Sequence, residues 1–219
     1  MNLWLASVAG VAVAYLLGGI PTGYLAGKLL QGIDIREHGS KSSGATNVLR
    51  TLGKWPALLV LLIDVLKGAG AVVLSRWLYG LASGTLPGSA ELQTWMPWAV
   101  CVAGLAAVLG HSRSIWLNFS GGKSAATGLG VLLAMSWPVG LGAAMVFGAV
   151  LAGSRIVSLS SMFAAVAAII IVCALGRPLP YQLLVIAGGL YVIVLHRSNI
   201  HRLLAGVEPR LGQSLRKTE

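Results

Sequence analysis

The uncharged stretch at residues 124–154, SAATGLGVLLAMSWPVGLGAAMVFGAVLAGS, decides how this chain is folded. It is too long for one membrane-spanning helix, which needs about 20 residues, and it is short for two. Trp137 and Pro138 stand near its middle, and proline suits a turn because it cannot donate a backbone hydrogen bond. The number of crossings within this stretch fixes the side on which all later segments lie.

The composition indicates a membrane protein. Of the 219 residues, 56% are hydrophobic and 10% are charged, and the mean hydropathy is +0.82. Soluble domains contain about 25% charged residues, so a soluble enzyme of this composition would expose too much apolar surface. Further apolar runs cover residues 3–27, 55–76, 95–110, 156–176 and 178–195. We predict an all-α, polytopic transmembrane protein, with residues 1–219 forming a single integral membrane domain.

The basic residues settle the number of spans. The chain has 16 Lys and Arg against 6 Asp and Glu, and basic residues collect on the cytoplasmic side of a membrane. Residues 28–54 and the tail from residue 197 are both basic. Two crossings within residues 124–154, with a turn at Trp137-Pro138, put both segments on one side. We therefore predict about seven spans, with the N-terminus outside and the C-terminus cytoplasmic.

The sequence gives little support for nucleic-acid binding, a disulfide or a metal site. No basic stretch carries the interleaved aromatic residues typical of nucleic-acid binding, so no nucleic-acid partner is expected. Cys101 and Cys173 lie in apolar runs, which favours buried small hydrophobes over a disulfide. The four histidines do not have the spacing of metal ligands. We predict no metal and no cofactor.

Three dense polar segments, residues 32–54, 111–127 and 196–208, are predicted to converge at the cytoplasmic face. The first is rich in glycine and hydroxyl groups, and backbone N–H groups in such loops can line an anion. Thr46 and Asn47 precede an apolar stretch, as helix-capping residues do. Arg50 follows one turn later, where a guanidinium can bind phosphate in a bidentate way. A solvated loop with a helix cap remains the alternative.

In the second segment, Gly121, Gly122 and Lys123 open an apolar helix. Free N–H groups at a helix start, together with a lysine, can bind phosphate. The segment is not a Walker A loop, because Leu117 stands where that motif needs glycine. The alternative is a turn in which Lys123 only extends to the membrane surface.

In the third segment, His196, Asn199 and Arg202 share one face of a predicted helix. A histidine at the membrane boundary can act as a general base or donate a hydrogen bond to a substrate. The alternative is an amphipathic helix held to anionic lipid. Glu208 is expected to pair with one of these cations and to be structural.

Asp64 and Lys67 form a pair of opposite charges inside a predicted span. Charges within a membrane are costly and are usually paired or functional. We expect either a tertiary anchor near the cytoplasmic end or a support for Arg50 or Lys123.

Together, the three segments resemble the bacterial acyl-phosphate:glycerol-3-phosphate acyltransferases, the PlsY family, over nearly the whole chain. The matching residues are Gly39-Ser40, Gly44-Ala-Thr-Asn47, Arg50, Gly110-His111, Gly121-Gly-Lys123, Ala126-Thr127, His196-Arg197, Asn199, Gly206 and Glu208. Ser42 and Ser124 depart from the family pattern at positions that affect loop geometry.

The resemblance implies transfer of a fatty acyl group from acyl phosphate to the 1-hydroxyl of sn-glycerol 3-phosphate, giving lysophosphatidic acid and phosphate. It implies a bacterial inner membrane location with the active site on the cytoplasmic face. The partners are acyl phosphate and glycerol 3-phosphate as substrates and the membrane lipids, with a soluble acyl-phosphate-forming enzyme as a further candidate.

The candidate site residues have three roles. Candidate catalytic residues, which act on the reacting groups, are Ser40, Arg50, Lys123, His196 and Asn199. Candidate substrate-binding residues are Thr46, Asn47, His111, Gly121, Gly122 and Thr127. Candidate supporting residues are Asp64, Lys67 and Glu208.

A transporter or flippase of phosphorylated or lipid substrates is the alternative function. It would place its polar groups near the bilayer midplane, whereas here they collect at one face. A structural membrane subunit would not need the Gly-Gly-Lys sequence. The sequence lacks both the H-x-x-x-x-D motif of acyl-CoA-type enzymes and a G-x-S-x-G nucleophile elbow.

Overall fold

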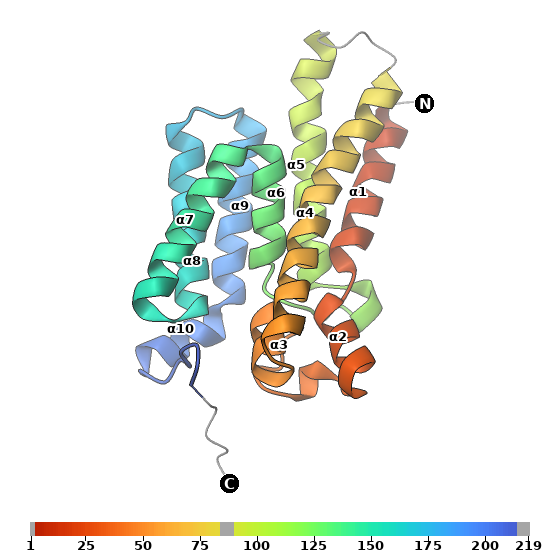
Figure 1. The fold of residues 1–219 in the computed structure, drawn as a ribbon. Coiled ribbons are helices and arrows are strands. Elements are labelled where there is room, and N and C mark those ends of the chain that lie inside the picture. The colour runs from red at the N-terminus through yellow and green to blue at the C-terminus, as the bar shows by residue number, and fades with distance from the viewer. Residues whose placement is uncertain (1–2, 84–89, 214–219) are drawn as a thin grey trace.

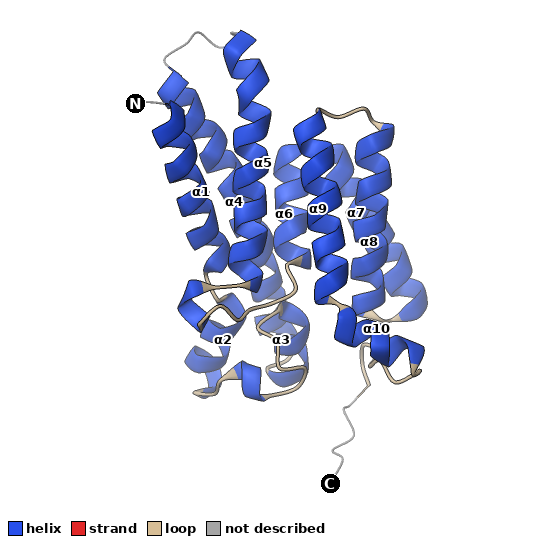
Figure 2. Ribbon diagram, turned by 180° about the vertical axis from the view of Figure 1, so that it is seen from behind, coloured by secondary structure: helices blue, strands red, loops and turns tan. Residues whose placement is uncertain are grey.

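A computed structural model describes residues 3–83 and 90–213, and its regular elements are all helices (Figures 1 and 2). The α-helices are α1 (Leu3–Gly19), α2 (Thr22–Gln31), α3 (Ala45–Thr51), α4 (Lys54–Ser83), α5 (Ala90–Ser112), α6 (Ala125–Met135), α7 (Trp137–Ser154), α8 (Val157–Ala174), α9 (Leu179–Leu195) and α10 (Arg197–Leu204). Two 3₁₀ turns, η1 (Ile35–Glu37) and η2 (Ile115–Leu117), lie in the loops. The predicted all-α, polytopic membrane architecture is confirmed.

The uncharged stretch at residues 124–154 doubles back on itself. It forms α6 and α7, which are separated by Ser136, with Pro138 in the first turn of α7. In the described ranges, five helical segments are long and apolar enough to cross a membrane, and the bent pair α9–α10 makes a sixth. With 11 residues, α6 is shorter than a usual span, so the count of seven stays a prediction.

The helices form two groups with α6 between them (Figure 1). One group contains α1, α4 and α5, and the other contains α7, α8 and α9. The short helices α2, α3 and α10 gather at one end, together with the three polar segments, which therefore converge as predicted. The α6–α7 and α8–α9 turns lie at the opposite end.

Glycines allow the helices to approach closely. A methyl group at Gly18 in α1 would overlap the backbone of Ala107 in α5, and one at Gly68 in α4 would overlap the carbonyl of Thr127 in α6. Lipid chains are as apolar as the helices, so close backbone packing replaces the hydrophobic effect in holding such helices together. These close contacts fix the positions of the helices that carry the polar end.

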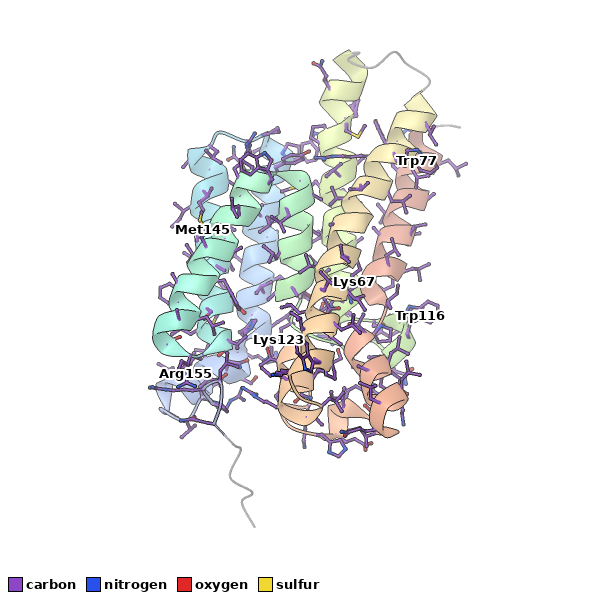
Figure 3. The ribbon with its side chains drawn as sticks, in the orientation of Figure 1. Lys67, Trp77, Trp116, Lys123, Met145 and Arg155 are labelled. Atoms are coloured by element: carbon purple, nitrogen blue, oxygen red, sulfur yellow. The ribbon has the colours of Figure 1, made fainter. Side chains whose placement is uncertain are left out.

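Exposed tryptophans mark the two ends of the apolar band. Trp77 is 59% exposed and Trp116 is 60% exposed, and they lie at different heights on the molecule (Figure 3). Tryptophan prefers the membrane–water interface. Lys123 lies close to the height of Trp116, so the polar residues around it lie near one membrane boundary.

Arg76 fixes the end of α6 remote from the polar segments. Its guanidinium donates to the carbonyl oxygens of Ala134 at 2.8 Å and Met135 at 3.2 Å, and to the Tyr181 hydroxyl at 3.1 Å. The last carbonyls of a helix have no intrahelical partner and favour a cation. This contact ties the short α6 to α4 and α9.

Candidate active site

The first polar segment is a loop organised around Asn47. The side chain of Asn47 is buried, and its Oδ1 accepts from the backbone N–H of Ser40 at 2.7 Å. Its Nδ2 lies within 3.0 Å of three loop carbonyl oxygens, those of Ile35, His38 and Ser42. A buried amide that joins four backbone groups fixes the loop and, with it, the position of Ser40.

The helix after this loop begins earlier than expected. The prediction that Thr46 and Asn47 cap it is wrong, because Gly44 is the N-cap of α3 and both residues lie inside the helix. The Asn47 amide is already occupied by the loop carbonyls, so it is not free to cap a helix end. Thr46 lines the apolar cavity described below.

Lys123 belongs to a continuous chain of polar contacts. Its Nζ donates to Oδ1 of Asn199, and Nδ2 of Asn199 donates to Glu208 at 2.6 Å. Glu208 also accepts from the Ser158 hydroxyl and from Nε of Arg202, each at 2.7 Å. The predicted pairing of Glu208 with a cation of the third segment is therefore confirmed. The second and third polar segments meet at Asn199.

Burial changes the proton affinity of these groups. Burial, with help from nearby Arg202, lowers the pKa of Lys123 to about 8, although the negative charge of Glu208 acts in the opposite direction. Burial alone would raise the pKa of Glu208, but the hydrogen bonds from Asn199, Ser158 and Arg202 lower it. At neutral pH the site thus contains a lysine cation and a glutamate anion, joined through Asn199.

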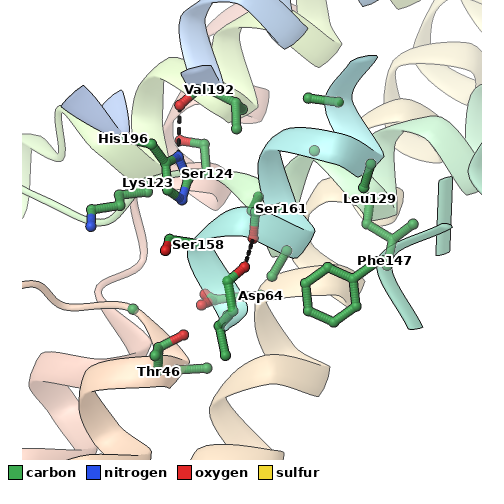
Figure 4. A pocket seen from close by; sticks show the side chains of 18 of the residues that line it. Thr46, Asp64, Lys123, Ser124, Leu129, Phe147, Ser158, Ser161, Val192 and His196 are labelled. Carbon is green, nitrogen blue, oxygen red and sulfur yellow. Dashed lines mark hydrogen bonds between the residues drawn. The ribbon is translucent and has the colours of Figure 1, made fainter. Parts of the chain in front are cut away.

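His196 lies at the bend between α9 and α10, whose axes differ by 56°. Its Nδ1 is 2.7 Å from the carbonyl oxygen of Val192 (Figure 4). A carbonyl oxygen only accepts, so Nδ1 carries the proton in the neutral ring and Nε2 holds the lone pair. His196 is thereby oriented as a hydrogen-bond acceptor at the cavity that it lines.

The Gly121-Gly122-Lys123 turn differs from the expected phosphate loop. The helix begins only at Ala125, and the N–H of Gly122 is not free, because it donates to the carbonyl oxygen of His111 at 3.1 Å. A methyl group at Gly122 would collide with the His111 ring. These glycines serve close packing against α5, and the expectation of a free Gly122 N–H is corrected.

The predicted pair of Asp64 and Lys67 is confirmed, with Nζ and Oδ1 2.8 Å apart. Both side chains are almost fully buried. Their other hydrogen bonds go to the Thr22 hydroxyl and the Ile20 carbonyl, and His111 lies beside Asp64. The pair makes no direct contact with Arg50 or Lys123. It joins α4 to the junction of α1 and α2, as expected of a tertiary anchor, and support of Arg50 or Lys123 through intervening residues stays a prediction.

Two cavities meet at this site. The first, of about 390 Å³, runs from the polar end into the bundle, and its far part is lined by α6, α7, α8 and α9. Figure 4 shows Lys123 and His196 at its polar side and Leu129 and Phe147 at its apolar side. The second, of about 290 Å³, is polar. Its cationic lining residues are Lys41, Arg113, Lys123 and Arg202.

Three residues line both cavities. These are Ser40, Ser42 and Lys123. Arg50 lines the apolar cavity near its polar end, and its guanidinium makes no hydrogen bond within the described part of the chain. An amphiphile with its chain in the first cavity would bring an anionic head to Lys123 and Arg50.

Some functional positions were missed or misplaced by sequence reasoning. Ser158, which bonds Glu208, is one hydroxyl in an apolar run and gives no periodic signal. Arg113 and Lys41 line the polar cavity, and a single basic residue in a polar loop gives no signal of such a position. The backbone carbonyl of Thr127 lies against Gly68 of α4, and Thr127 is not among the residues that line either cavity. Among residues 3–83 and 90–213, no three His, Cys, Asp or Glu side chains are placed to hold a metal ion.

The chain is similar to known proteins over most of its length. A family model described as glycerol-3-phosphate acyltransferase matches residues 8–206. Glycerol-3-phosphate acyltransferase 2 of Rhizobium johnstonii is 71% identical over 217 residues, covering 97% of this chain and 99% of the relative. Glycerol-3-phosphate acyltransferase of Trichormus variabilis is 59% identical, covering 98% and 96%.

Solved structures agree with the sequence comparisons. The crystal structure of PlsY, an integral membrane glycerol 3-phosphate acyltransferase, in its glycerol 3-phosphate form has a TM-score of 0.83 and 36% identity, and the match covers 94% of this chain and 96% of that one. The lysophosphatidic acid form has a TM-score of 0.80, with coverage of 94% and 95%. The fold and the site thus define an integral membrane acyltransferase. The chain belongs to the glycerol-3-phosphate acyltransferase family, of which PlsY is a member.

Proposed function

We propose that this protein transfers a fatty acyl group from acyl phosphate to the 1-hydroxyl of sn-glycerol 3-phosphate. The products are lysophosphatidic acid and inorganic phosphate. The reaction takes place at the cytoplasmic face of a bacterial inner membrane, within the single membrane domain. A soluble enzyme that forms acyl phosphate would supply the donor from the same side.

One observation carries this proposal: Lys123 lies where an apolar cavity meets a polar, cationic one. The donor has an apolar chain and a phosphate head, and the acceptor is small, polar and phosphorylated. The apolar cavity suits the acyl chain, and the cations of the polar cavity suit the acceptor phosphate. The reacting carbonyl carbon then lies between the two, beside Lys123 and Ser40.

The chemistry is a single displacement at the acyl carbon. The hydroxyl oxygen of glycerol 3-phosphate attacks the carbonyl carbon, and the bond from that carbon to the phosphate oxygen breaks. The phosphate leaves with the bonding electrons. The hydroxyl proton passes to a phosphate oxygen, whose second pKa is near 6, or to Nε2 of His196. Acyl phosphate is already activated, so no acyl-enzyme intermediate is needed.

Each site residue has a role that its contacts support. Lys123 and Arg50 stabilise the charge on the donor phosphate as it leaves. Asn199 orients Lys123 and is held by Glu208. Ser40, whose backbone is fixed by Asn47, is placed to orient the acceptor hydroxyl or the carbonyl oxygen.

The test uses the purified protein in detergent with palmitoyl phosphate and isotopically labelled glycerol 3-phosphate, in the presence of a chelator. We expect lysophosphatidic acid and phosphate in equal amounts without ATP or added metal. Parallel reactions contain palmitoyl-CoA or palmitoyl-acyl carrier protein in place of the acyl phosphate. Product formed only with one of these donors would refute the donor assignment, and no product with any donor would refute the activity.

A further inference from the structure

A buried ionic cluster lies behind the loop that carries Lys123. Its centre is Asp64 on α4, whose Oδ1 accepts from the Thr22 hydroxyl at 2.7 Å and from Nζ of Lys67 at 2.8 Å. Lys67 also donates to the carbonyl oxygen of Ile20 at 2.8 Å. The cluster therefore joins α4 to the junction of α1 and α2, and it leaves one side of Asp64 facing α5.

His111, at the end of α5, occupies that remaining side. Its Nδ1 lies 3.6 Å from Oδ1 of Asp64, and its side chain is 6% exposed. This nitrogen has no hydrogen-bond partner within the described chain, so the Asp64 carboxylate is the polar group that it faces. Asp64 thus restricts the rotation of a buried ring that makes no other polar contact through this atom.

The opposite edge of the His111 ring packs on the Lys123 loop. The atom nearest to a methyl group placed at Gly122 is Nε2 of His111, followed by two other atoms of the same ring. The backbone of His111 also holds the loop, because its carbonyl oxygen accepts from the Gly122 N–H at 3.1 Å. On the other side of Lys123, the Ser124 hydroxyl donates to the carbonyl oxygen of Val108 at 2.8 Å. Lys123 is thus flanked by two residues attached to the last turns of α5.

We propose that His111, held by Asp64, is a positioning residue that places Lys123 at the junction of the two cavities. The ring of His111 also lines the apolar cavity, and its effect on Lys123 is transmitted through Gly122. The proposal rests on the proposed function only for the statement that Lys123 contacts substrate. The chain of contacts runs from Asp64 to His111, from His111 to Gly122, and from Lys123 to Asn199.

The role of Gly122 allows a specific test. Its φ angle is not among the positive ones, so alanine is conformationally allowed there, and the obstacle to a methyl group is the His111 ring. Gly122→Ala alone should push the loop away from α5. Removing the ring in His111→Ala should make room for the same methyl group. The two substitutions are therefore expected to compensate for each other.

The experiment compares the wild type, Gly122→Ala, His111→Ala and the double variant by kcat/KM, with thermal unfolding as the folding control. A displacement of about 1 Å can cost about 100-fold in rate. We expect Gly122→Ala to lose about 10- to 100-fold in the wild-type background and less than about 3-fold in the His111→Ala background. Gly70→Ala, on α4 with open space around it, is the matched control and should retain full activity.

His111→Asn separates the two contacts of the ring. Asparagine can face Asp64 but is too short to reach Gly122, so it should keep the fold and recover only part of the activity. It also replaces His111→Ala in the double variant if the alanine variant does not fold. Equal losses from Gly122→Ala in both backgrounds, or wild-type kcat/KM in folded His111→Ala, would overturn the proposal.

A second readout does not depend on the reaction. The rate at which an amine-reactive reagent modifies Lys123 is measured by mass spectrometry, with Lys41 as the internal reference. We expect a several-fold change at Lys123 in His111→Ala and none at Lys41, since the contact with Asn199 is disturbed. An unchanged rate at Lys123 refutes the positioning role, whereas an inactive wild type with a changed rate refutes only the proposed function.

Discussion

The side-chain amide of Asn199 donates to the carboxylate of Glu208 at 2.6 Å, and through this contact Glu208 orients the amide group that Lys123 contacts. Asn199 has one oxygen and one NH₂ group. Because Glu208 engages the NH₂ group, the oxygen is turned toward Lys123. The orientation of the amide, and hence the position of Lys123, depends on the negative charge of Glu208.

Removing the Glu208 carboxylate should destabilise the protein. Glu208→Ala leaves Asn199, Ser158 and Arg202 without their common acceptor, and buried donors without partners are costly. We expect a loss of about 2–3 kcal/mol in the free energy of unfolding, seen as a lower apparent Tm in detergent. Glu208→Gln keeps one acceptor oxygen and should lose less. Equal Tm values for the wild type and Glu208→Ala would contradict this role.

Lys123 should confer an alkaline limit on activity. Its pKa is lowered to about 8, so the ammonium is present below that pH and is lost as the pH rises through it. A hydrogen bond to a charged group contributes about 1.5–3 kcal/mol, so Lys123→Ala should lose about 10- to 100-fold in kcat/KM. The profile of kcat/KM against pH for the wild type should fall above about pH 8.

Lys123→Arg is the matched variant for this profile. A guanidinium keeps its charge through this range but has a different shape and reach, so activity should be partly restored and the alkaline limit should move upward. The rate of spontaneous acyl phosphate hydrolysis is subtracted at each pH. A fully active Lys123→Arg variant, together with a normal kcat/KM for folded Lys123→Ala, would mean that Lys123 only fixes the membrane topology.

The spans were predictable because apolar runs report burial in a membrane directly. The turn between α6 and α7 was also predictable, since the two basic segments, residues 28–54 and the tail from residue 197, can lie on one side only if the chain doubles back there. The convergence of the three polar segments follows from the same reasoning. The sequence contained this information because membrane insertion depends on hydropathy and on the placement of basic residues.

The contacts within the site were less predictable, because one residue type serves several purposes. Asparagine is a common residue at helix caps, yet Asn47 lies inside the helix and its side chain holds the preceding loop. Gly122 suits a phosphate loop, yet its missing side chain makes room for His111. Only the three-dimensional packing distinguishes these uses, because a sequence motif does not show what lies opposite a residue.

The side of the membrane on which the polar end lies can be tested by cysteine labelling. In a background without Cys101 and Cys173, single cysteines at Ser42, Trp137 and Ser198 are treated with a membrane-impermeant maleimide on intact and on opened cells. We expect Ser42 and Ser198 to react only after opening, and Trp137 to react in intact cells. Opposite behaviour of Ser42 and Ser198 would refute the count of seven spans.

The apolar cavity should limit the length of the acyl chain that the enzyme accepts. Ala168 on α8 is 2% exposed and lines the apolar part of the cavity, remote from Lys123. Ala168→Leu adds three carbon atoms to this part of the cavity. Long chains must reach further into the bundle than short ones, so kcat/KM should fall more for an octadecanoyl donor than for an octanoyl donor.

Ile170→Leu, two residues along the same helix and 62% exposed on the outer surface, is the control and should leave the ratio of the two kcat/KM values unchanged. The ratio of kcat/KM values for the two donors cancels differences in the amount of active protein, so it reports the cavity alone. An equal loss for both chain lengths in a folded Ala168→Leu protein would show that the acyl chain does not extend to this part of the bundle.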